Sequence, residues 1–294
     1  LRPYQFCNLT EVVVRAKDRF DDLKRKVMLA TILGTAQSTL TKFPYLRKIW
    51  QKNTEEERLL GVSLTGIMDN ELTNGRKHGL EKTLTALREI AVETNKEWSA
   101  IFSVPQSTAI TCVKPSGTVS QLVDSSSGIH PRHSSFYVRT VRGDNKDPLT
   151  QFMIDSKIPN EPDFMKPDTQ TVFSFPMKSP KKSVVRNDMT AIEQLEMWLV
   201  YQRHWCEHKP SVTVSVRDEE WMEVGAFVFK HFDEMSGVSF LPHSDHTYQQ
   251  APYQDCTEAV YNDFSSKFRH IDWNKFTTYE KEDNTKSSQT FACS

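Results

Sequence analysis

The sequence predicts an α/β protein with mostly parallel strand pairing. Strand-like segments alternate with long helical segments along the chain. One helical segment carries Leu23, Val27, Ala30 and Leu33 as an apolar stripe at helical spacing. The clearest strand, 211–216, alternates valines with hydroxyl residues, as a half-buried strand does. These three observations together predict the α/β class.

Two further features define the elements of the first half. Residues 6–14 are rich in β-branched residues and predict the first strand. Thr54-Glu55-Glu56-Glu57 has the pattern of a capping box and predicts the start of a helix. The expected elements are a strand at 6–14, a helix at 18–40, a helix from Thr54 towards Met68, a helix at about 80–102 and a buried strand at 109–113.

The second half continues the alternation. Thr190-Ala191-Ile192-Glu193 is a second capping box, and Asp218 is expected to cap the helix that follows the 211–216 strand. Trp198, Tyr201 and Trp205 lie close together on the first of these helices and predict core residues. The remaining expected elements are strands at 136–142, 171–175 and 238–241 and one short helix within 144–168. The chain loses its apolar period after about residue 272, and 285–294 is typical of a mobile tail.

The composition is that of a soluble globular protein, with 37% apolar and 26% charged residues among 294. A net charge of −1 argues against nucleic acid as the main partner, and no apolar run reaches membrane-spanning length. The five cysteines, 7, 112, 206, 256 and 293, form no secreted disulfide framework, which favours a reducing, cytoplasmic setting. The chain begins without Met and carries a cysteine near each end, so we expect a piece of a redox enzyme.

The segment after the strand at 109–113 is a candidate anion site. Pro115, Ser116, Gly117, Thr118, Val119 and Ser120 predict a tight turn that opens a helix. Gly117 would let a ligand approach the backbone, while the amides of the helix start and the hydroxyls of Ser116, Thr118 and Ser120 could bind phosphate. An ordinary capped loop between strand and helix is an equally good interpretation. The turn is no P-loop, because it lacks a Gly-Lys-Ser/Thr ending.

The other candidate groups favour structural roles. His130 and His133 are three residues apart, as are His243 and His246, but no Cys-x-x-Cys motif accompanies them, so we expect hydrogen-bonded loop histidines and no metal site. Cys112 lies between apolar residues and predicts a buried, inert thiol.

Seven stretches, taken in order, resemble ribonucleotide reductase, specifically the adenosylcobalamin-dependent class II enzyme of the monomeric, triphosphate-reducing kind. No single stretch is decisive, but the ordered set is specific. The stretches are Phe6-Cys7-Asn8-Leu9-Thr10-Glu11, Gly61-Val62-Ser63-Leu64-Thr65-Gly66-Ile67-Met68-Asp69, Pro115-Ser116-Gly117-Thr118-Val119-Ser120, Ser126-Ser127-Gly128-Ile129-His130-Pro131, Glu207-His208-Lys209-Pro210-Ser211-Val212-Thr213-Val214-Ser215, Gly237-Val238-Ser239-Phe240-Leu241-Pro242 and Gln249-Gln250-Ala251-Pro252-Tyr253.

The resemblance implies a fold and its domains. Residues 1–272 would form the second half of a ten-stranded α/β barrel, a mostly parallel five-stranded half-barrel with surrounding helices, and 273–294 a flexible, redox-active carboxyl-terminal tail. The family's thiyl-radical cysteine lies in an Asn-x-Cys-x-Glu motif, which is absent from this sequence and would lie just upstream of Leu1. We therefore expect the chain to be inactive alone.

The resemblance also implies site residues and partners. Cys7 matches the second cysteine of the active-site dithiol, residues 115–120 match the turn that binds the substrate phosphates, and Cys293 matches the first of two tail cysteines that re-reduce the active site. The cofactor would be adenosylcobalamin, with its site mostly outside this chain. The partners would be a ribonucleoside triphosphate, the amino-terminal half of the reductase on the same or a separate chain, and a thioredoxin-like reductant.

Two alternatives to this interpretation stay open. The chain could be the carboxyl-terminal half of a class I large subunit, but it lacks the adjacent tyrosine pair of that class, which favours a cofactor-generated radical. Glu11, in place of the usual Gly-Ser after Asn-Leu, favours the monomeric branch. The chain could also be one piece of a split reductase that folds and acts only with a separate amino-terminal polypeptide.

Overall fold

The computed structural model describes residues 2–243 and 249–280, which divide between two compact units. Unit 1 comprises Leu1–Arg132 and Ser179–Ser244, and unit 2 comprises His133–Lys178 and Asp245–Ser294. The sequence did not predict this division. Each unit is built from two separate segments of the chain, so the segment 133–178 is an insertion into unit 1.

Unit 1 contains the parallel strands. Its elements are β1 (Asn8–Val13), α1 (Phe20–Gln37), α2 (Lys48–Glu57), β2 (Leu60–Thr65), η1 (Ile67–Asp69), α3 (Leu80–Ile101), β3 (Thr111–Cys112), α4 (Val119–Leu122), η2 (Arg186–Asp188), α6 (Ala191–His204), β7 (Val212–Val216), η3 (Asp218–Glu220), α7 (Trp221–Lys230), η4 (Phe232–Glu234) and β8 (Val238–Pro242). Strands β1, β2 and β3 pair in parallel in that order, and β7 pairs in parallel with β8. A parallel bridge between Val113 and Pro210 joins the two sheets. The predicted α/β class is therefore confirmed.

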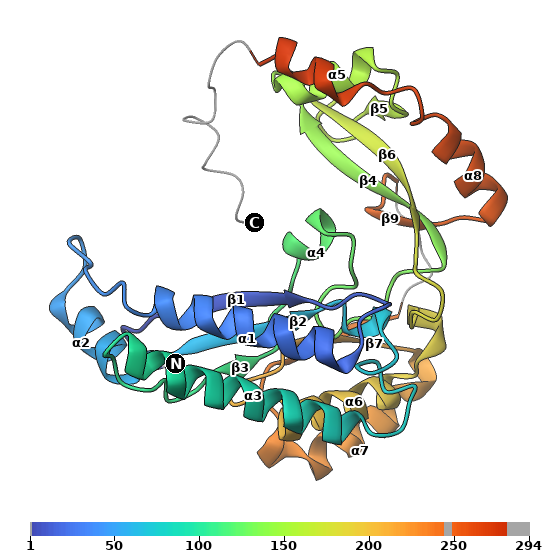
Figure 1. Ribbon diagram of the computed structural model, residues 1–294. Coiled ribbons are helices and arrows are strands. Elements are labelled where there is room, and N and C mark those ends of the chain that lie inside the picture. Colours follow the sequence, from blue (N-terminus) through green and yellow to red (C-terminus); the bar gives the residue numbers. More distant parts are fainter. Residues whose placement is uncertain (1, 244–248, 281–294) are drawn as a thin grey trace. The chain divides into compact units, whose positions relative to one another are not determined.

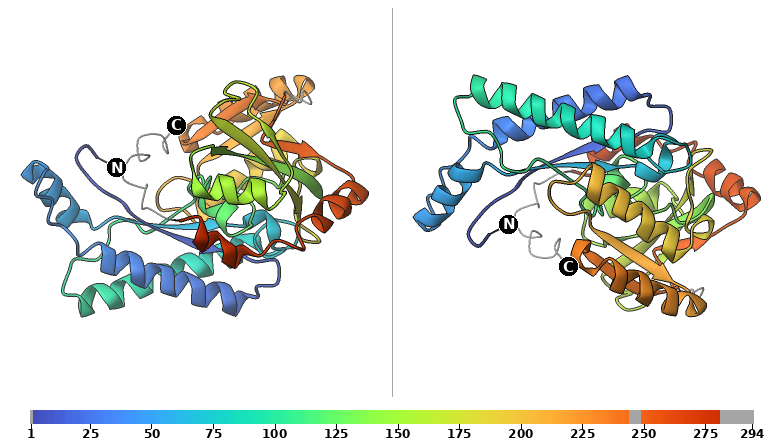
Figure 2. Two further views of the ribbon diagram at one scale, coloured as in Figure 1. Left: turned by 90° about the horizontal axis from the view of Figure 1, so that it is seen from above. Right: turned by 90° about the horizontal axis from the view of Figure 1, so that it is seen from below.

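The long helices α1 and α3 cover one face of β1 and β2 (Figure 1). They lie side by side in both views of Figure 2. At this face a methyl group on Gly34 of α1 would touch Leu60 and Thr10 at 3.4 and 3.7 Å, so helix and sheet are in close contact. The short helix α4 stands on the other side of the sheet (Figure 1). One face of the sheet is thus packed into the core, and the other, which we call the open face, carries the exposed Leu9 and the half-buried Glu11 on β1.

The aromatic residues of α6 lie in the core, as predicted. Trp198, Tyr201 and Trp205 are fully buried. Their polar atoms are paired, because buried N–H and O–H groups need partners: Trp198 donates to the Pro210 carbonyl, Tyr201 to the Thr73 carbonyl and Trp205 to the Cys112 carbonyl. The bond to Cys112 attaches the end of α6 to β3, while Pro210 and Thr73 lie in the connecting segments. The capping box at Thr190 also forms as predicted.

The predicted helix from Thr54 towards Met68 is wrong. Helix α2 begins at Lys48 and ends at Glu57, and the following residue, Arg58, adopts a left-handed conformation with φ 46°. Residues Leu60–Thr65 instead form β2, the central strand of the three, and all six are buried. Leu60, Val62 and Leu64 alternate with Gly61, Ser63 and Thr65, which is the period of a strand, but the preceding capping-box pattern was extended through them as a helix. Asp218, which was expected to cap a helix, is instead the first residue of the short 3-10 helix η3.

Unit 2 is antiparallel, in contrast to the predicted mostly parallel pairing. Its elements are β4 (Phe136–Asp144), α5 (Pro148–Asp155), β5 (Asn160–Pro162), β6 (Gln170–Lys178), β9 (Tyr253–Asp255), α8 (Glu258–Ser266) and η5 (Trp273–Thr278). The sheet order is β5-β6-β4-β9, and every pair in it is antiparallel. Trp273, Phe276 and Tyr279 contact the buried ring of Phe152. Ordered structure therefore continues beyond residue 272, where the tail was expected to begin.

Candidate functional site

The open face of the β1–β2–β3 sheet carries the reactive side chains of unit 1. Side chains alternate along a strand, so Cys7, Leu9 and Glu11 share one face of the first strand. Gly61 lies opposite Leu9 on β2. A methyl group on Gly61 would lie 2.4 Å from the Leu9 side chain, 3.0 Å from the Cys7 sulfur and 3.4 Å from the Cys112 sulfur. The missing side chain of Gly61 therefore leaves a space that Leu9 and the two thiols share.

The two thiols differ in exposure. Cys7 is partly exposed, whereas Cys112 is fully buried, as predicted. Burial raises the pKa of Cys7, and the positive charge of Lys114 opposes that rise. Burial raises the pKa of Cys112 to about 12. Cys206, also buried, has its pKa raised well above the usual value by desolvation. Because the thiolate is the reactive form, Cys7 is the best nucleophile of these three.

The turn at 115–120 has the predicted form. It follows β3, turns at Gly117 and Thr118, and opens α4 at Val119. No hydrogen bond joins the amides of Gly117, Thr118 and Val119 to another residue in the described ranges. A methyl group on Gly117 would meet nothing within 4 Å. Its φ lies outside the left-handed region, so glycine keeps the space open here without being required by the backbone.

Two of the three hydroxyls expected to face a ligand are already engaged within the turn. Ser116 Oγ donates to Glu11 Oε2 at 2.7 Å and accepts the Ser120 amide at 3.1 Å. The Ser120 hydroxyl donates to the Ser116 carbonyl. Both serines are buried, and Thr118 is exposed. The hydroxyls of Ser116 and Ser120 thus hold the turn in shape, while the amides of 117–119 remain for a ligand.

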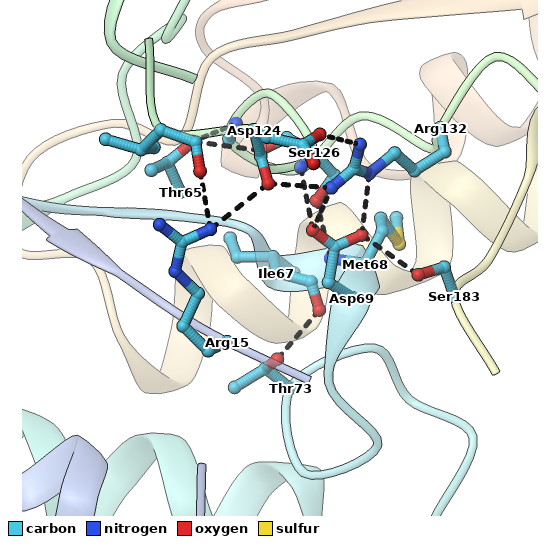
Figure 3. A network of polar contacts seen from close by, with 12 residues as sticks. Arg15, Thr65, Ile67, Met68, Asp69, Thr73, Asp124, Ser126, Arg132 and Ser183 are labelled. Carbon is cyan, nitrogen blue, oxygen red and sulfur yellow. Dashed lines mark hydrogen bonds and ion pairs between the residues drawn. The ribbon is translucent and has the colours of Figure 1, made fainter. Parts of the chain in front are cut away.

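A buried ion-pair network holds the loop that follows α4 (Figure 3). Asp69, at the end of η1, accepts two hydrogen bonds from Arg132, each 2.9 Å long, and both side chains are buried. The Ser126 amide and the Ser183 hydroxyl also bond to Asp69. Arg132 in addition pairs with Asp124 at 2.8 Å. A buried carboxylate needs such full pairing, and the network fixes the chain on the carboxyl side of the turn.

Sequence reasoning did not assign Glu11, Gly61 or Lys114 to the site. Glu11 was noted only for its bearing on the class. The period of two along β1, which places residue 11 on the face of Cys7, is the signal that could have found it. Gly61 could not be found this way, because the strand that carries it was predicted as a helix.

The remaining candidates have structural roles or lie outside the described residues. His130 accepts the Thr213 amide at 3.0 Å and contacts the Ser127 carbonyl at 2.9 Å, as expected of a hydrogen-bonded loop histidine. The described residues contain no group of three or more His, Cys, Asp and Glu side chains that could hold a metal ion. None of the described helices is long and apolar enough to cross a membrane. Cys293 lies outside the described residues.

No family model matches the chain. Three curated proteins are similar to it over most of its length. A probable adenosylcobalamin-dependent ribonucleoside-triphosphate reductase from Dictyostelium discoideum is 28% identical over 282 residues, 94% of this chain and 36% of the relative. The adenosylcobalamin-dependent ribonucleoside-triphosphate reductase of Euglena gracilis is 27% identical and that of Lactobacillus gasseri 25%, covering 92% and 87% of this chain and 37% and 38% of the relatives.

A crystal structure of a B12-dependent, class II ribonucleotide reductase shares the fold. It superposes with a TM-score of 0.82 and 21% sequence identity over 96% of this chain and 43% of the other. The chain spans 36–38% of the length of these three curated relatives. The resemblance to the adenosylcobalamin-dependent ribonucleoside-triphosphate reductases, predicted from the ordered motifs, is thereby confirmed over nearly the whole chain.

Proposed function

We propose that this chain forms part of the active site of an adenosylcobalamin-dependent ribonucleotide reductase, which converts ribonucleoside triphosphates to deoxyribonucleotides. The observation that carries the proposal is the arrangement of the open face of unit 1. There the partly exposed thiol of Cys7 lies on the strand whose Glu11 bonds to the 115–120 turn. The chain that folds this way is 28% identical to such a reductase over 94% of its length.

In this proposal Cys7 is one thiol of the dithiol that reduces the substrate. Two thiols become a disulfide and supply two electrons and two protons, while the ribose hydroxyl leaves as water. Cys7 suits this role because its sulfur is partly exposed, whereas Cys112 and Cys206 are buried. The second thiol would come from the amino-terminal half. Cys293 and a second tail thiol would restore the dithiol by thiol–disulfide exchange, and a thioredoxin-like protein would supply their electrons.

The turn at 115–120 would hold the substrate's phosphates. Three unpaired amides, those of residues 117–119, suit an anion, and the open space at Gly117 lets it approach the backbone. The hydroxyls of Ser116 and Ser120 would support this site indirectly by holding the turn.

The strand order of unit 1 supports the finer proposal for the fold. Five parallel strands follow one another as β1-β2-β3-β7-β8, with the Val113–Pro210 bridge in the middle. We propose that they are half of the ten-stranded barrel. The other half would be supplied by the amino-terminal part of the reductase.

The curated relatives carry adenosylcobalamin dependence in their names. We propose the same cofactor for the complete reductase, where it would start the radical chemistry. The described residues supply a thiol and amides suited to phosphate, and we propose no cofactor contact for any of them. The four described cysteines are free thiols, which supports a reducing compartment such as the cytoplasm.

The test begins with the coding sequence upstream of Leu1. We expect an Asn-x-Cys-x-Glu motif there or on a separate polypeptide. A protein that combines both parts should reduce a ribonucleoside triphosphate in the presence of adenosylcobalamin and a dithiol, and the 294-residue chain alone should not. Reduction by the chain alone, or none by the combined protein, would contradict the proposal.

A further inference from the structure

Glu11 is the carboxylate that joins the thiol-bearing strand to the turn. It lies on β1, four residues after Cys7 and on the same face. It accepts the Ser116 hydroxyl at 2.7 Å, and its side chain is half-buried. Ser116 is bonded directly to Gly117, whose amide is the first of the three unpaired ones. Nothing in the proposed dithiol chemistry uses this carboxylate.

The charged and titratable groups around Glu11 leave it without a cation of its own. The thiol of Cys112 interacts with it from β3. On its own strand lies Cys7, and β2 presents Gly61 and Ser63, neither of which titrates. Lys114 acts on the two thiols. No ion pair with Glu11 forms among the residues that the structure describes. Burial raises the pKa of Glu11, while the Ser116 hydrogen bond partly opposes the rise.

A phosphate on the turn would add negative charge close to this carboxylate. Only a few covalent bonds separate the Ser116 hydroxyl from the Gly117 amide, so an anion bound to that amide would lie within about 10 Å of the Glu11 carboxylate. This distance is roughly one Debye length at 0.1 M salt, so the two charges still interact. A nearby like charge favours the neutral acid. The protonated acid still accepts from Ser116 and gains an O–H donor that the carboxylate lacks.

We propose that Glu11 takes up a proton when a phosphate group binds to the amides of residues 117–119. This inference rests on the proposed phosphate site and adds that the site binds its ligand together with a proton. Binding would therefore strengthen as the pH falls towards the pKa of Glu11. Glu11 acts through Ser116 in shaping the turn and through its charge in setting the pH dependence of binding.

Isothermal titration calorimetry of the protein with inorganic triphosphate, and separately with a ribonucleoside triphosphate, tests this proposal. The titration is run at pH 6 and 7 in two buffers that differ in ionisation enthalpy. The binding constant reports the phosphate site, and the difference in heat between buffers reports proton uptake. We expect Glu11 to take up at most about one proton per bound ligand. The ligand's own gain or loss of protons adds to the measured value.

Two variants separate Glu11 from that ligand contribution. Glu11→Gln keeps the shape and the acceptor for Ser116 but cannot titrate, so uptake should fall to what the ligand alone takes up. Glu55→Gln is the matched control, because Glu55 accepts the Thr41 hydroxyl at the same 2.7 Å elsewhere in unit 1. It should leave uptake unchanged. If both the unchanged protein and Glu11→Gln bind the ligand with equal proton uptake, the role of Glu11 is wrong and the phosphate site is retained. If neither protein binds the ligand, both the phosphate site and the role of Glu11 are wrong.

Discussion

Cys7 and Cys112 show how strongly burial changes the solvent access and the pKa of a thiol. Both sulfurs approach the vacant side-chain position of Gly61, yet only Cys7 reaches solvent. Burial raises the pKa of both groups, to about 12 for Cys112. The apolar neighbours of Cys112 predicted its burial, whereas the partial exposure of Cys7 depends on strand pairing that the sequence does not specify.

This difference predicts the order of thiol modification. Iodoacetamide at pH 8 should alkylate Cys7 and Cys256 before Cys112 and Cys206, since the first two are partly exposed. The rate at Cys7 should rise with pH, because its raised pKa leaves little thiolate near neutrality. Peptide mapping by mass spectrometry measures the order, and a sample unfolded in urea is the control in which the order should disappear. Early modification of Cys112 in the folded protein would contradict the structure.

The Asp69–Arg132 pair predicts a large loss of stability. Arg132→Ala leaves the buried Asp69 carboxylate without its bidentate partner. Removing one partner of a buried pair costs about 3–5 kcal/mol, so the free energy of unfolding should fall by that amount. Lys52→Ala, which breaks the exposed 3.9 Å pair with Glu56, should lower the free energy of unfolding far less, because water screens that pair. Urea denaturation of both variants measures the difference. Equal losses would show that the buried network does not stabilise the fold.

At the level of elements, local patterns were predictable and partners were not. The strand β7, the capped helix α6 and the turn at 117–118 follow from residues close in sequence, and the structure has all three. The strand β2 was missed although its leucines and valine alternate with small residues, because the capping-box pattern at Thr54 was extended through it as a helix. The antiparallel pairing of β4 with β6 was also missed, since a strand's period does not specify its partner. The Glu11–Ser116 bond joins residues 105 positions apart, which no local pattern shows.

Gly66, in the turn that follows β2, is predicted to tolerate no larger residue without a loss of stability. Gly66 has φ +81°, and a methyl group there would lie 2.2 Å from the Val14 carbonyl oxygen. Gly66→Ala therefore combines backbone strain with a clash against backbone, and we expect a loss of about 1–3 kcal/mol or more. Gly225→Ala is the control, because it lies in α7 with nothing within 4 Å and alanine favours helix. Thermal unfolding should show a lower Tm for Gly66→Ala alone. An unchanged Tm would contradict the β2 turn.

At the scale of the whole molecule, the chain contributes five parallel strands and the partly exposed thiol of Cys7 to the proposed active site. It spans 36–38% of the length of three curated reductases, yet folds like a class II reductase over 96% of its own length. Unit 1 presents its reactive face on the side of the sheet opposite α1 and α3 (Figure 1). A half-barrel completed by another part of the protein would enclose that face.

The complete reductase should separate the roles of Cys7 and Cys293. Cys7→Ser removes one sulfur of the proposed dithiol, so turnover should stop with a thioredoxin-like reductant and with a small dithiol alike. Cys293→Ser should stop turnover with the protein reductant but retain most of it with the small dithiol, which reaches the active-site disulfide directly. Cys206→Ser is the control at a buried thiol. Multiple-turnover assays with both reductants decide. Normal turnover by Cys7→Ser, or equal failure of Cys293→Ser with both reductants, would remove that cysteine from its proposed role.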